Sequence, residues 1–446
     1  MRRILTRAAR IAVYLVAFVV PPVLISVVGV RAALADRYEP PPGERSAQVA
    51  VPAHDPAKPT AVVLLNHGGT EVTDALAPFQ VFAESGAFNV YLAAPTKRQV
   101  TLSGGLDVLP QLSLAELDRR LGGRSPDVVV VPAMWRVGSA GQRPVADWLR
   151  KHAPSIGTLM SVCDGAEVLA DAGLLEGRRA TASWANLAKW EKRHPDVKWV
   201  RGSRYVQDGT VLTSAGVTSG VVAALHVVRD RLGEPAATAL AERIGYPDTR
   251  LGDEPRIPVD ALSPADRALY VLRGAWTPHK PQIGVVVTEG ASEIELASAF
   301  DAYPGPAFTS RTTSLGPSSV RSAHGLTFVP RYALDDPPEL DRLVVPGRTV
   351  PPRVRSQVED TGIRPYYVHV GSDGFPFDAT LRDLAEHENV PLTRFNARLL
   401  EYPTGHLSLT GPGWPVLPTV LLVTAGLLGL AIVGALDVVI RRRRAP

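Results

Sequence analysis

The sequence has 446 residues, of which 45% are hydrophobic and 21% charged, a composition typical of a folded chain and not of a disordered or polytopic one. The net charge of +4 comes from the two ends, because the segment between the terminal arginine clusters is mildly acidic. We therefore expect no nucleic-acid partner. The single cysteine, Cys163, excludes an intramolecular disulfide and a four-cysteine zinc site, and the sequence predicts neither a metal nor a cofactor.

Two long apolar runs lie beside these arginine clusters. Residues 11–30 and 416–436 carry no charge, and a helix of roughly 20 residues spans about 30 Å, the thickness of the hydrocarbon core of a bilayer. We predict a membrane anchor at 1–35 and a second membrane helix at 414–440. Arginines flank the outer end of each run, which predicts that both termini are cytoplasmic and that the main domains are extracytoplasmic in the cell membrane.

The first apolar run has an alternative interpretation. Ala33-Leu34-Ala35 has the form of a signal-peptide cleavage site. The run is long for a signal peptide, which favours an uncleaved anchor, kinked midway at Pro21 and Pro22. Residues 36–59 follow as a proline-rich linker, predicted to be an extended tether between membrane and domain.

From residue 60, short apolar runs alternate with amphipathic segments. The predicted strands are 61–65, 88–93, 127–131 and 158–162, and the predicted helices between them are 74–85, 113–121 and 145–152. Strands that are apolar throughout are typical of parallel sheets covered on both faces. We therefore predict an α/β sandwich with right-handed crossover connections.

Three segments of this part return later in the chain in the same order. Residues 58–71 (KPTAVVLLNHGGTE) return from residue 280 (KPQIGVVVTEGASE), residues 105–110 (GLDVLP) at 325–330 (GLTFVP), and residues 127–132 (DVVVVP) at 341–346 (DRLVVP). The order and the near-constant offset predict two copies of one α/β unit. The first copy covers 60–235 and the second 280–410, with a helical connector at 236–279.

The candidate reactive group is Cys163. An apolar strand runs directly into it and an apolar helix face begins at Ala166, which predicts a strand-turn-helix elbow at the carboxyl edge of the sheet. A helix N-terminus stabilises a thiolate, whereas Asp164 and Glu167 add negative charge in the same turn, so the direction of the thiol pKa shift stays open. The alternative role is a small buried hydrophobic residue. The elbow position favours an exposed, functional thiol.

The residues around this elbow carry a resemblance to a known family. Residues 161–200 (SVCDGAEVLADAGLLEGRRATASWANLAKWEKRHPDVKWV) and 205–228 (YVQDGTVLTSAGVTSGVVAALHVV) resemble the ThiJ/PfpI family of the class I glutamine amidotransferase-like superfamily, in the branch often fused to AraC-type regulators. The resemblance covers about residues 60–235. Together with the internal repeat and the two apolar runs, it implies a fold of two flavodoxin-like three-layer α/β sandwich units, the second degenerate, between the terminal transmembrane helices.

The resemblance also implies site residues. Cys163 and Asp74 would be catalytic, with Asp74 hydrogen-bonded to the elbow cysteine; the alternative for Asp74 is a helix N-terminal charge. The implied binding residues are Asp164, Gly165, Ser183, Trp184, Ala133 and Met134.

The chain departs from the family pattern at two places. Ser183 stands where the branch usually has the histidine of Ala-Thr-x-His-Trp, so a general base is missing. Pro132-Ala133-Met134 stands where the family has Pro-Gly-Gly, so the close backbone approach needed for an oxyanion site is lost. His67 is a conceivable substitute base, although a loop histidine is more often solvated.

The second copy departs further. Glu295 takes the place of Asp74 when counted back from Phe300, and falls one residue off when counted forward from 292–294. Ser372 echoes the nucleophile position, but Pro376 follows where an elbow helix should already be running. We interpret this copy as a scaffold or docking domain, with a serine nucleophile as the alternative.

Two functions from different classes remain. One is a membrane-anchored extracytoplasmic module for ligand binding, sensing or an accessory role. The other is a cysteine-dependent enzyme of the hydrolase, hydratase or thiol redox type that uses Cys163 and Asp74. The missing base favours the first. The expected partners are the membrane, an unidentified small molecule or protein, and a homodimer as the resemblance implies.

Overall fold

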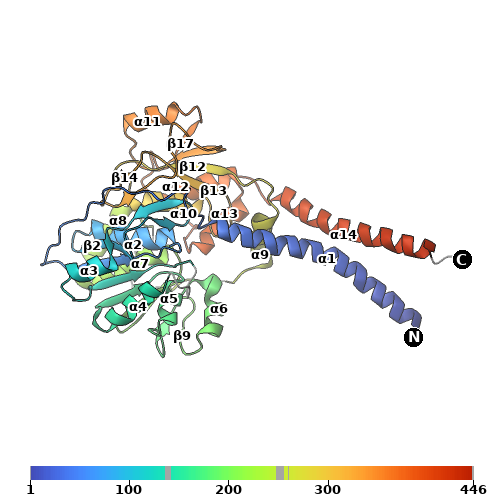
Figure 1. Ribbon diagram of the computed structural model, residues 1–446, viewed down its shortest axis with the longest axis horizontal. Coiled ribbons are helices and arrows are strands. Elements are labelled where there is room, and N and C mark those ends of the chain that lie inside the picture. Colours follow the sequence, from blue (N-terminus) through green and yellow to red (C-terminus); the bar gives the residue numbers. More distant parts are fainter. Residues whose placement is uncertain (1, 136–141, 248–255, 260, 444–446) are drawn as a thin grey trace. The chain divides into compact units, whose positions relative to one another are not determined.

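The computed structural model describes residues 2–135, 142–247, 256–259 and 261–443 (Figure 1). The chain divides into two compact units. One consists of residues 1–36, 263–280 and 413–446, and contains an apolar helix near each end of the sequence. The other consists of residues 37–262 and 281–412, and is a mixed α/β structure.

The helical unit contains α1 (Arg2–Asp36), α9 (Pro264–Ala275) and α14 (Val416–Arg443). Helices α1 and α14 are long and apolar enough to cross a membrane. Helix α1 continues through Pro21 and Pro22. Glycines bring α14 close to α1, because a Cβ at Gly429 would run into the backbone carbonyl of Ala17.

The large sheet of the α/β unit has seven strands in the order β10-β11-β7-β6-β1-β2-β5. Their bounds are β1 (Thr60–Leu64), β2 (Asn89–Ala94), β5 (Leu112–Ser113), β6 (Val128–Val131), β7 (Thr158–Ser161), β10 (Tyr205–Asp208) and β11 (Val211–Ser214). Every neighbouring pair is parallel except β10 and β11. The four strands predicted from apolar runs fall on β1, β2, β6 and β7, because each is buried along nearly its whole length.

Helices pack on both faces of this sheet. Ala61 and Val63 of β1 belong to the core shared with α2, α7 and α8, whereas Val62 and Leu64 belong to the core shared with α3, α4, α5 and α6. The helix bounds are α2 (Val72–Glu84), α3 (Leu114–Arg120), α4 (Arg143–His152), α5 (Gly165–Asp171), α6 (Trp184–Arg193), α7 (Ser219–Leu232) and α8 (Glu234–Ile244), with a short 3-10 turn η1 (Ala153–Ser155). A two-stranded sheet of β8 (Arg179–Ala180) and β9 (Lys198–Trp199) flanks them.

Residues 281–412 form a smaller parallel sheet in the order β13-β12-β16-β17. The bounds are β12 (Gln282–Val286), β13 (Arg311–Leu315), β16 (Arg342–Val345), β17 (Pro365–Tyr367), α10 (Glu293–Ala302), α11 (Pro352–Glu359), α12 (Pro376–His387) and α13 (Val390–Leu399). Helix α11 lies on the outer side of this sheet in Figure 1. Pro376 does not interrupt a helix, because it is the first residue of α12, where proline is tolerated.

A third sheet joins the two parts of the α/β unit. It contains β14 (Val320–Arg321), β15 (Thr327–Phe328), β4 (Leu106–Leu109) and β3 (Val100–Leu102), in that order and antiparallel throughout. The linker after α1 is not a free tether, because the Arg45 guanidinium donates hydrogen bonds to the carbonyls of Pro330 and Arg331. In the predicted connector, α8 belongs to the α/β unit and α9 to the helical unit.

Candidate functional site

A tight turn between β7 and α5 carries Cys163. Strand β7 ends at Ser161 and α5 begins at Gly165. The φ angle of Cys163 is 54°, in the left-handed region that costs a non-glycine residue about 1–3 kcal/mol. Gly165 is required, because a Cβ there would meet the carbonyl oxygen of Val131. The turn places Cys163, partly buried, at the carboxyl edge of the sheet.

Asp74 lies in the first turn of α2 and is fully buried. The N-cap residue Glu71 accepts a hydrogen bond from the Asp74 backbone N–H at 2.6 Å. Asp74 Oδ2 accepts from the backbone N–H of Ala133 at 3.0 Å, while its Oδ1 has no hydrogen-bond partner among the described residues. Burial raises the pKa of Asp74 to about 8, although the hydrogen bond from the Ala133 N–H acts to lower it.

The thiol of Cys163 lies among carboxyl groups. Burial raises its pKa well above the ordinary value, and the negative charges of Asp74, Asp164 and Glu71 raise it further. No hydrogen bond between Cys163 Sγ and Asp74 is present in the described part of the chain; Asp74 bonds to the loop after β6 instead. The sequence left the direction of this shift open, and the structure makes it upward, which favours the neutral thiol.

Asp164 turns toward α6. Its Oδ1 accepts a hydrogen bond from the Trp190 indole at 2.8 Å, and its Oδ2 accepts from the Asn186 side chain at 2.5 Å. Burial nevertheless raises the pKa of Asp164. Asp164 therefore fixes the elbow against α6 through both carboxylate oxygens.

Ala133 and Met134 fasten the loop after β6 to the start of α2. The Ala133 carbonyl accepts from the Glu71 N–H at 2.9 Å, in addition to the bond that its own N–H makes with Asp74. Met134 is buried and forms an isolated bridge with Thr70. Where the resemblance implied ligand-binding residues, the structure places backbone groups that position Asp74 and Glu71.

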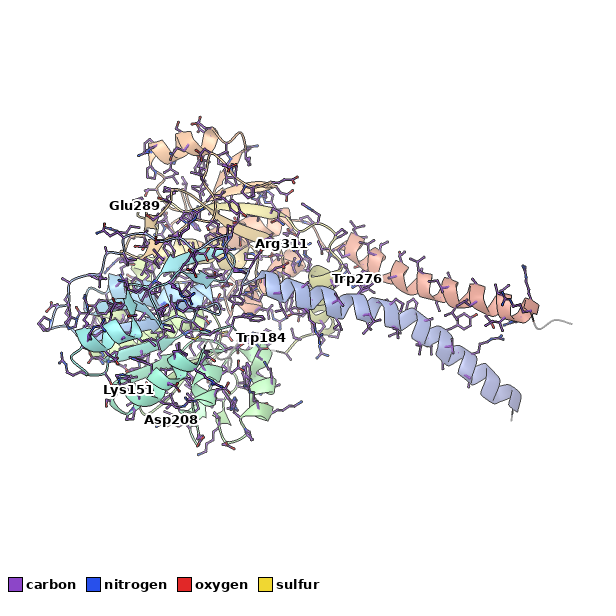
Figure 2. All side chains as sticks on the ribbon, viewed as in Figure 1. Lys151, Trp184, Asp208, Trp276, Glu289 and Arg311 are labelled. Carbon is purple, nitrogen blue, oxygen red and sulfur yellow. The ribbon has the colours of Figure 1, made fainter. Side chains whose placement is uncertain are left out.

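Ser183 and Trp184 lie at the start of α6. Ser183 is buried and is the N-cap of α6, but its side chain makes no capping hydrogen bond. The Trp184 indole donates to the Arg398 carbonyl at 3.0 Å, and the Arg398 guanidinium lies over the ring at 5.5 Å (Trp184 is labelled in Figure 2). Trp184 therefore joins the first α/β part to α13 of the second.

Sequence reasoning missed a buried group of charges beside α2. The Arg37 guanidinium lies 3.0 Å from Asp301 Oδ1 and 3.7 Å from Glu71 Oε1. Asp301 Oδ2 accepts from the Thr73 hydroxyl at 2.9 Å. Burial and the neighbouring Asp74 raise the pKa of Glu71 to about 7, and burial and Glu71 raise that of Asp301.

Two aromatic rings lie next to this group. Tyr38 stacks on Trp135 with ring centroids 5.2 Å apart. Gly69, with φ of 118°, lies beneath the Tyr38 ring, which a Cβ would strike. Arg37 and Tyr38, assigned to the tether by sequence, thus belong to the surroundings of the candidate site.

His67, the conceivable substitute base, faces elsewhere. Its Nε2 lies 2.8 Å from the Thr96 hydroxyl, and burial followed by Arg98 lowers its pKa. No hydrogen bond joins His67 and Cys163 in the described residues.

In the smaller sheet, His369 follows β17 as Cys163 follows β7 in the large sheet. Val131 pairs with Ser161 in the large sheet, and Val345 pairs with Tyr367 in the small one. Counting two residues on from the second member of each pair gives Cys163 and His369. Ser372, the position named from sequence, lies three residues further.

His369 is buried and bonded on both ring nitrogens. The Gly347 N–H donates to Nδ1 at 3.1 Å, and Nε2 lies 3.2 Å from the Ser298 hydroxyl. Burial lowers its pKa to about 3. Glu295 accepts from the Arg348 N–H at 3.1 Å, as Asp74 accepts from Ala133. Among the described residues, no group of His, Cys, Asp and Glu has the arrangement of a metal site.

Comparison with known proteins places this geometry in a family. Residues 60–230 match the model of the DJ-1/PfpI family. A Streptomyces lividans protein, named only as an uncharacterized protein in the cpoL 5' region, is 32% identical over 142 residues, which are 31% of this chain and 98% of that protein. The chain belongs to the DJ-1/PfpI family.

Relatives of this DJ-1/PfpI domain include an enzyme and a regulator. The isonitrile hydratase of Pseudomonas putida is 29% identical over 202 residues, 43% of this chain and 77% of that protein. The HTH-type transcriptional regulator CdhR of Pseudomonas aeruginosa is 32% identical over 117 residues, 26% of this chain but only 34% of that regulator. The ThiJ/PfpI resemblance is thus confirmed, and the family covers both classes of function.

Proposed function

We propose that the DJ-1/PfpI domain of this chain is a ligand-binding module with a sensing or accessory role. The observation that carries the proposal is the charge around Cys163, where burial and three carboxyl groups disfavour the thiolate. A cysteine nucleophile needs a thiolate or a base that takes its proton, and Ser183 stands where the resemblance places that base.

The same groups define the ligand class. At neutral pH the Cys163 thiol and the Asp74 carboxylic acid both keep their protons, since both pKa values lie above 7. They offer two hydrogen-bond donors and no fixed positive charge. A small uncharged molecule with a carbonyl or similar acceptor fits this arrangement of donors.

The experiment compares two probes of the same shape on the full chain in detergent. N-Cyclohexylformamide carries a carbonyl acceptor, and cyclohexyl isocyanide is the corresponding isonitrile. We expect saturation-transfer NMR to show reversible binding of the formamide, weakened in Asp74→Ala, and no conversion of the isonitrile. Formamide production that disappears in Cys163→Ser would contradict the proposal and establish the enzymatic alternative.

That alternative is a cysteine-dependent hydratase, and the free Oδ1 of protonated Asp74 favours it. Cys163 sulfur would bond to the isonitrile carbon, Asp74 would protonate that carbon, and the thiol proton would pass to Asp74. Water would then displace the sulfur, giving the formamide and the free thiol. Isonitrile hydratase of Pseudomonas putida, named for such a substrate, supports this reading.

We further propose that α1 and α14 span the cell membrane, with both termini cytoplasmic and the α/β unit outside. The arginines at the outer ends of both apolar runs support this orientation. Fusions at residue 446 should be fluorescent with a green fluorescent reporter and inactive with alkaline phosphatase. The reverse pattern would refute the orientation.

Finally, we propose that residues 281–412 are a reduced second copy of the DJ-1/PfpI unit. Strand order β13-β12-β16-β17 repeats the order β2-β1-β6-β7 of the large sheet. The hairpin β14–β15 corresponds to β3–β4, and α10 to α2. The described residues 281–412 contain no helices that correspond to α3, α5 and α6 of the first copy. This reduction is consistent with a scaffold role.

A further inference from the structure

The helices α2 and α10 begin in the same way. Glu71 is the N-cap of α2 and accepts from the Asp74 N–H, and Ser292 is the N-cap of α10 and accepts from the Glu295 N–H. In both helices the third residue is acidic, and its carboxyl group accepts a hydrogen bond from a backbone N–H in the loop that follows β6 or β16. The two helix starts are therefore equivalent residue by residue.

Gln80 lies nine residues after the N-cap of α2 and reaches the start of α10. Its Oε1 accepts from the Ser292 hydroxyl and from the Ile294 N–H, both at 2.8 Å. These are the N-cap residue and the second residue of α10. The Gln80 side chain is buried in this contact.

Asp301 lies nine residues after the N-cap of α10 and makes the reciprocal contact. It accepts from the Thr73 hydroxyl at 2.9 Å, and it is linked to Glu71 through the Arg37 guanidinium, which lies 3.0 Å from Asp301 and 3.7 Å from Glu71. Thr73 and Glu71 are the second residue and the N-cap residue of α2. Helices α2 and α10 pack against each other (Figure 1). One contact made twice, with the partners exchanged, is the signature of a two-fold relation between the copies.

The two contacts differ in charge. Gln80 brings a neutral amide to α10, whereas Asp301 brings a carboxyl group to α2, on the side where Cys163 lies. Arg37 accompanies Asp301, and its guanidinium also lies 3.7 Å from Glu71. Attraction between Arg37 and the Cys163 thiolate is among the interactions that raise the pKa of Arg37.

We propose that Asp301 is a positioning residue for the Cys163 site, supplied by the second copy across the internal two-fold axis, and that it holds Arg37 against Glu71. The site of the first copy is then incomplete without residues 281–412. This inference rests on the proposed binding function, and it names residues 281–412 as the part of the same chain that completes the site.

The sign of the effect follows from the groups that face Cys163. These are Asp74 and Glu71 from α2, Asp164 from the elbow, and Arg37 from the linker. The thiol titrates above the carboxyl groups, whose pKa values are about 7 and 8 for Glu71 and Asp74, so it loses its proton when they are already ionised. Removing the Asp301 carboxyl group releases Arg37 from its 3.0 Å ion pair, whereas removing Arg37 takes a positive charge out of this group.

The test measures the alkylation rate of Cys163 by iodoacetamide against pH in the full chain in detergent, where the single cysteine gives one signal. We expect Asp301→Asn to react about tenfold faster than the parent at a fixed pH, one pKa unit being a factor of ten. Arg37→Gln should react several-fold more slowly. If Asp301 and Arg37 had a purely structural role, the alkylation rates of both variants would change in the same direction.

Gln80→Glu is the matched control, because it changes the charge at the equivalent position beside α10. It should leave the alkylation profile of Cys163 within twofold of the parent. Equal effects of Gln80→Glu and Asp301→Asn, a same-direction shift in Asp301→Asn and Arg37→Gln, or no shift in Asp301→Asn would overturn the proposal. If Asp301→Asn does not fold, an unchanged rate in folded Arg37→Gln overturns it alone.

The readout needs no ligand, so its failure is distinguishable from that of the proposed function. If formamide binding is absent but the alkylation rates of Asp301→Asn and Arg37→Gln change as expected, only the ligand proposal is wrong. Intact binding with no charge effect would sink the role of Asp301 only.

Discussion

Val108 and Phe328 lie directly opposite each other in the antiparallel pair of β4 and β15. They hold the same position in the repeated segments GLDVLP and GLTFVP. The neighbouring bond, from the Val329 N–H to the Asp107 carbonyl at 3.0 Å, joins residues on either side of this pair. A two-fold axis between two copies of one unit brings equivalent residues face to face in this way, so the pairing supports the proposed duplication.

This pairing predicts a disulfide within one chain. Opposite residues of an antiparallel pair have Cβ atoms about 5 Å apart, within the adjustment that a disulfide needs. In a Cys163→Ser background, Val108→Cys with Phe328→Cys should oxidise to an intramolecular bond, seen as faster migration on a non-reducing gel. Val108→Cys with Thr327→Cys, offset by one residue, is the control that should stay reduced. Disulfide-linked dimers in place of the internal bond would contradict the pairing.

The strands and the elbow position were predictable from sequence, and the charge group was not. Buried parallel strands such as Val128–Val131 are apolar throughout, and a cysteine directly after such a strand occupies the turn into the next helix. Arg37 and Asp301 are 264 residues apart, and they meet only because α10 packs on α2. The internal repeat contains a signal that could have found this group, because aligning the starts of α2 and α10 gives Asp301 and Gln80 equivalent positions.

The proposed second copy shows the same limit. A Gly-Ser-Asp-Gly string suggested Ser372 as the elbow residue, whereas the strand register assigns that position to His369. Register is a property of hydrogen bonding between strands and is not visible in a short string. Nothing in the sequence placed Trp184 on Arg398 either, because that contact joins two separate helices.

The raised carboxyl pKa values predict how stability changes with pH. A carboxyl group whose pKa is higher in the folded state stabilises the fold fully below its ordinary pKa, and this contribution is lost as pH rises through the folded value. For Asp74 that range runs from 3.8 to about 8. The melting temperature of the full chain should therefore fall between pH 5 and pH 8.

Asp74→Asn should flatten this decline, since the amide resembles the neutral acid and cannot ionise. The difference at pH 8 should be on the order of 5 kcal/mol, from about 1.4 kcal/mol for each pKa unit between 3.8 and about 8, and should appear as a clear rise in melting temperature. Asp147→Asn on exposed α4 should keep the parental slope. A slope in Asp74→Asn as steep as in the parent would show that the buried carboxyl does not titrate as described.

The packing of α14 on α1 gives a test of the helical unit. A Cβ at Gly429 would collide with the Ala17 carbonyl, whereas at Gly434 the nearest atom, the Tyr14 hydroxyl oxygen, is 4.0 Å away. Gly429→Ala should therefore destabilise the unit by about 1–3 kcal/mol, the usual cost of overpacking. Gly434→Ala should be near neutral. Equal melting temperatures for the two variants in detergent would contradict the packing.

The most direct measurement of the central claim is the ultraviolet absorbance of the Cys163 thiolate near 240 nm as pH rises, with Cys163→Ser as the blank. Because the chain has one cysteine, the titration reports this thiol alone. We predict a midpoint above 9, the ordinary value, because carboxyl groups and burial disfavour the thiolate. A midpoint at or below 7 would show a stabilised thiolate and would contradict the account of a neutral, non-catalytic elbow.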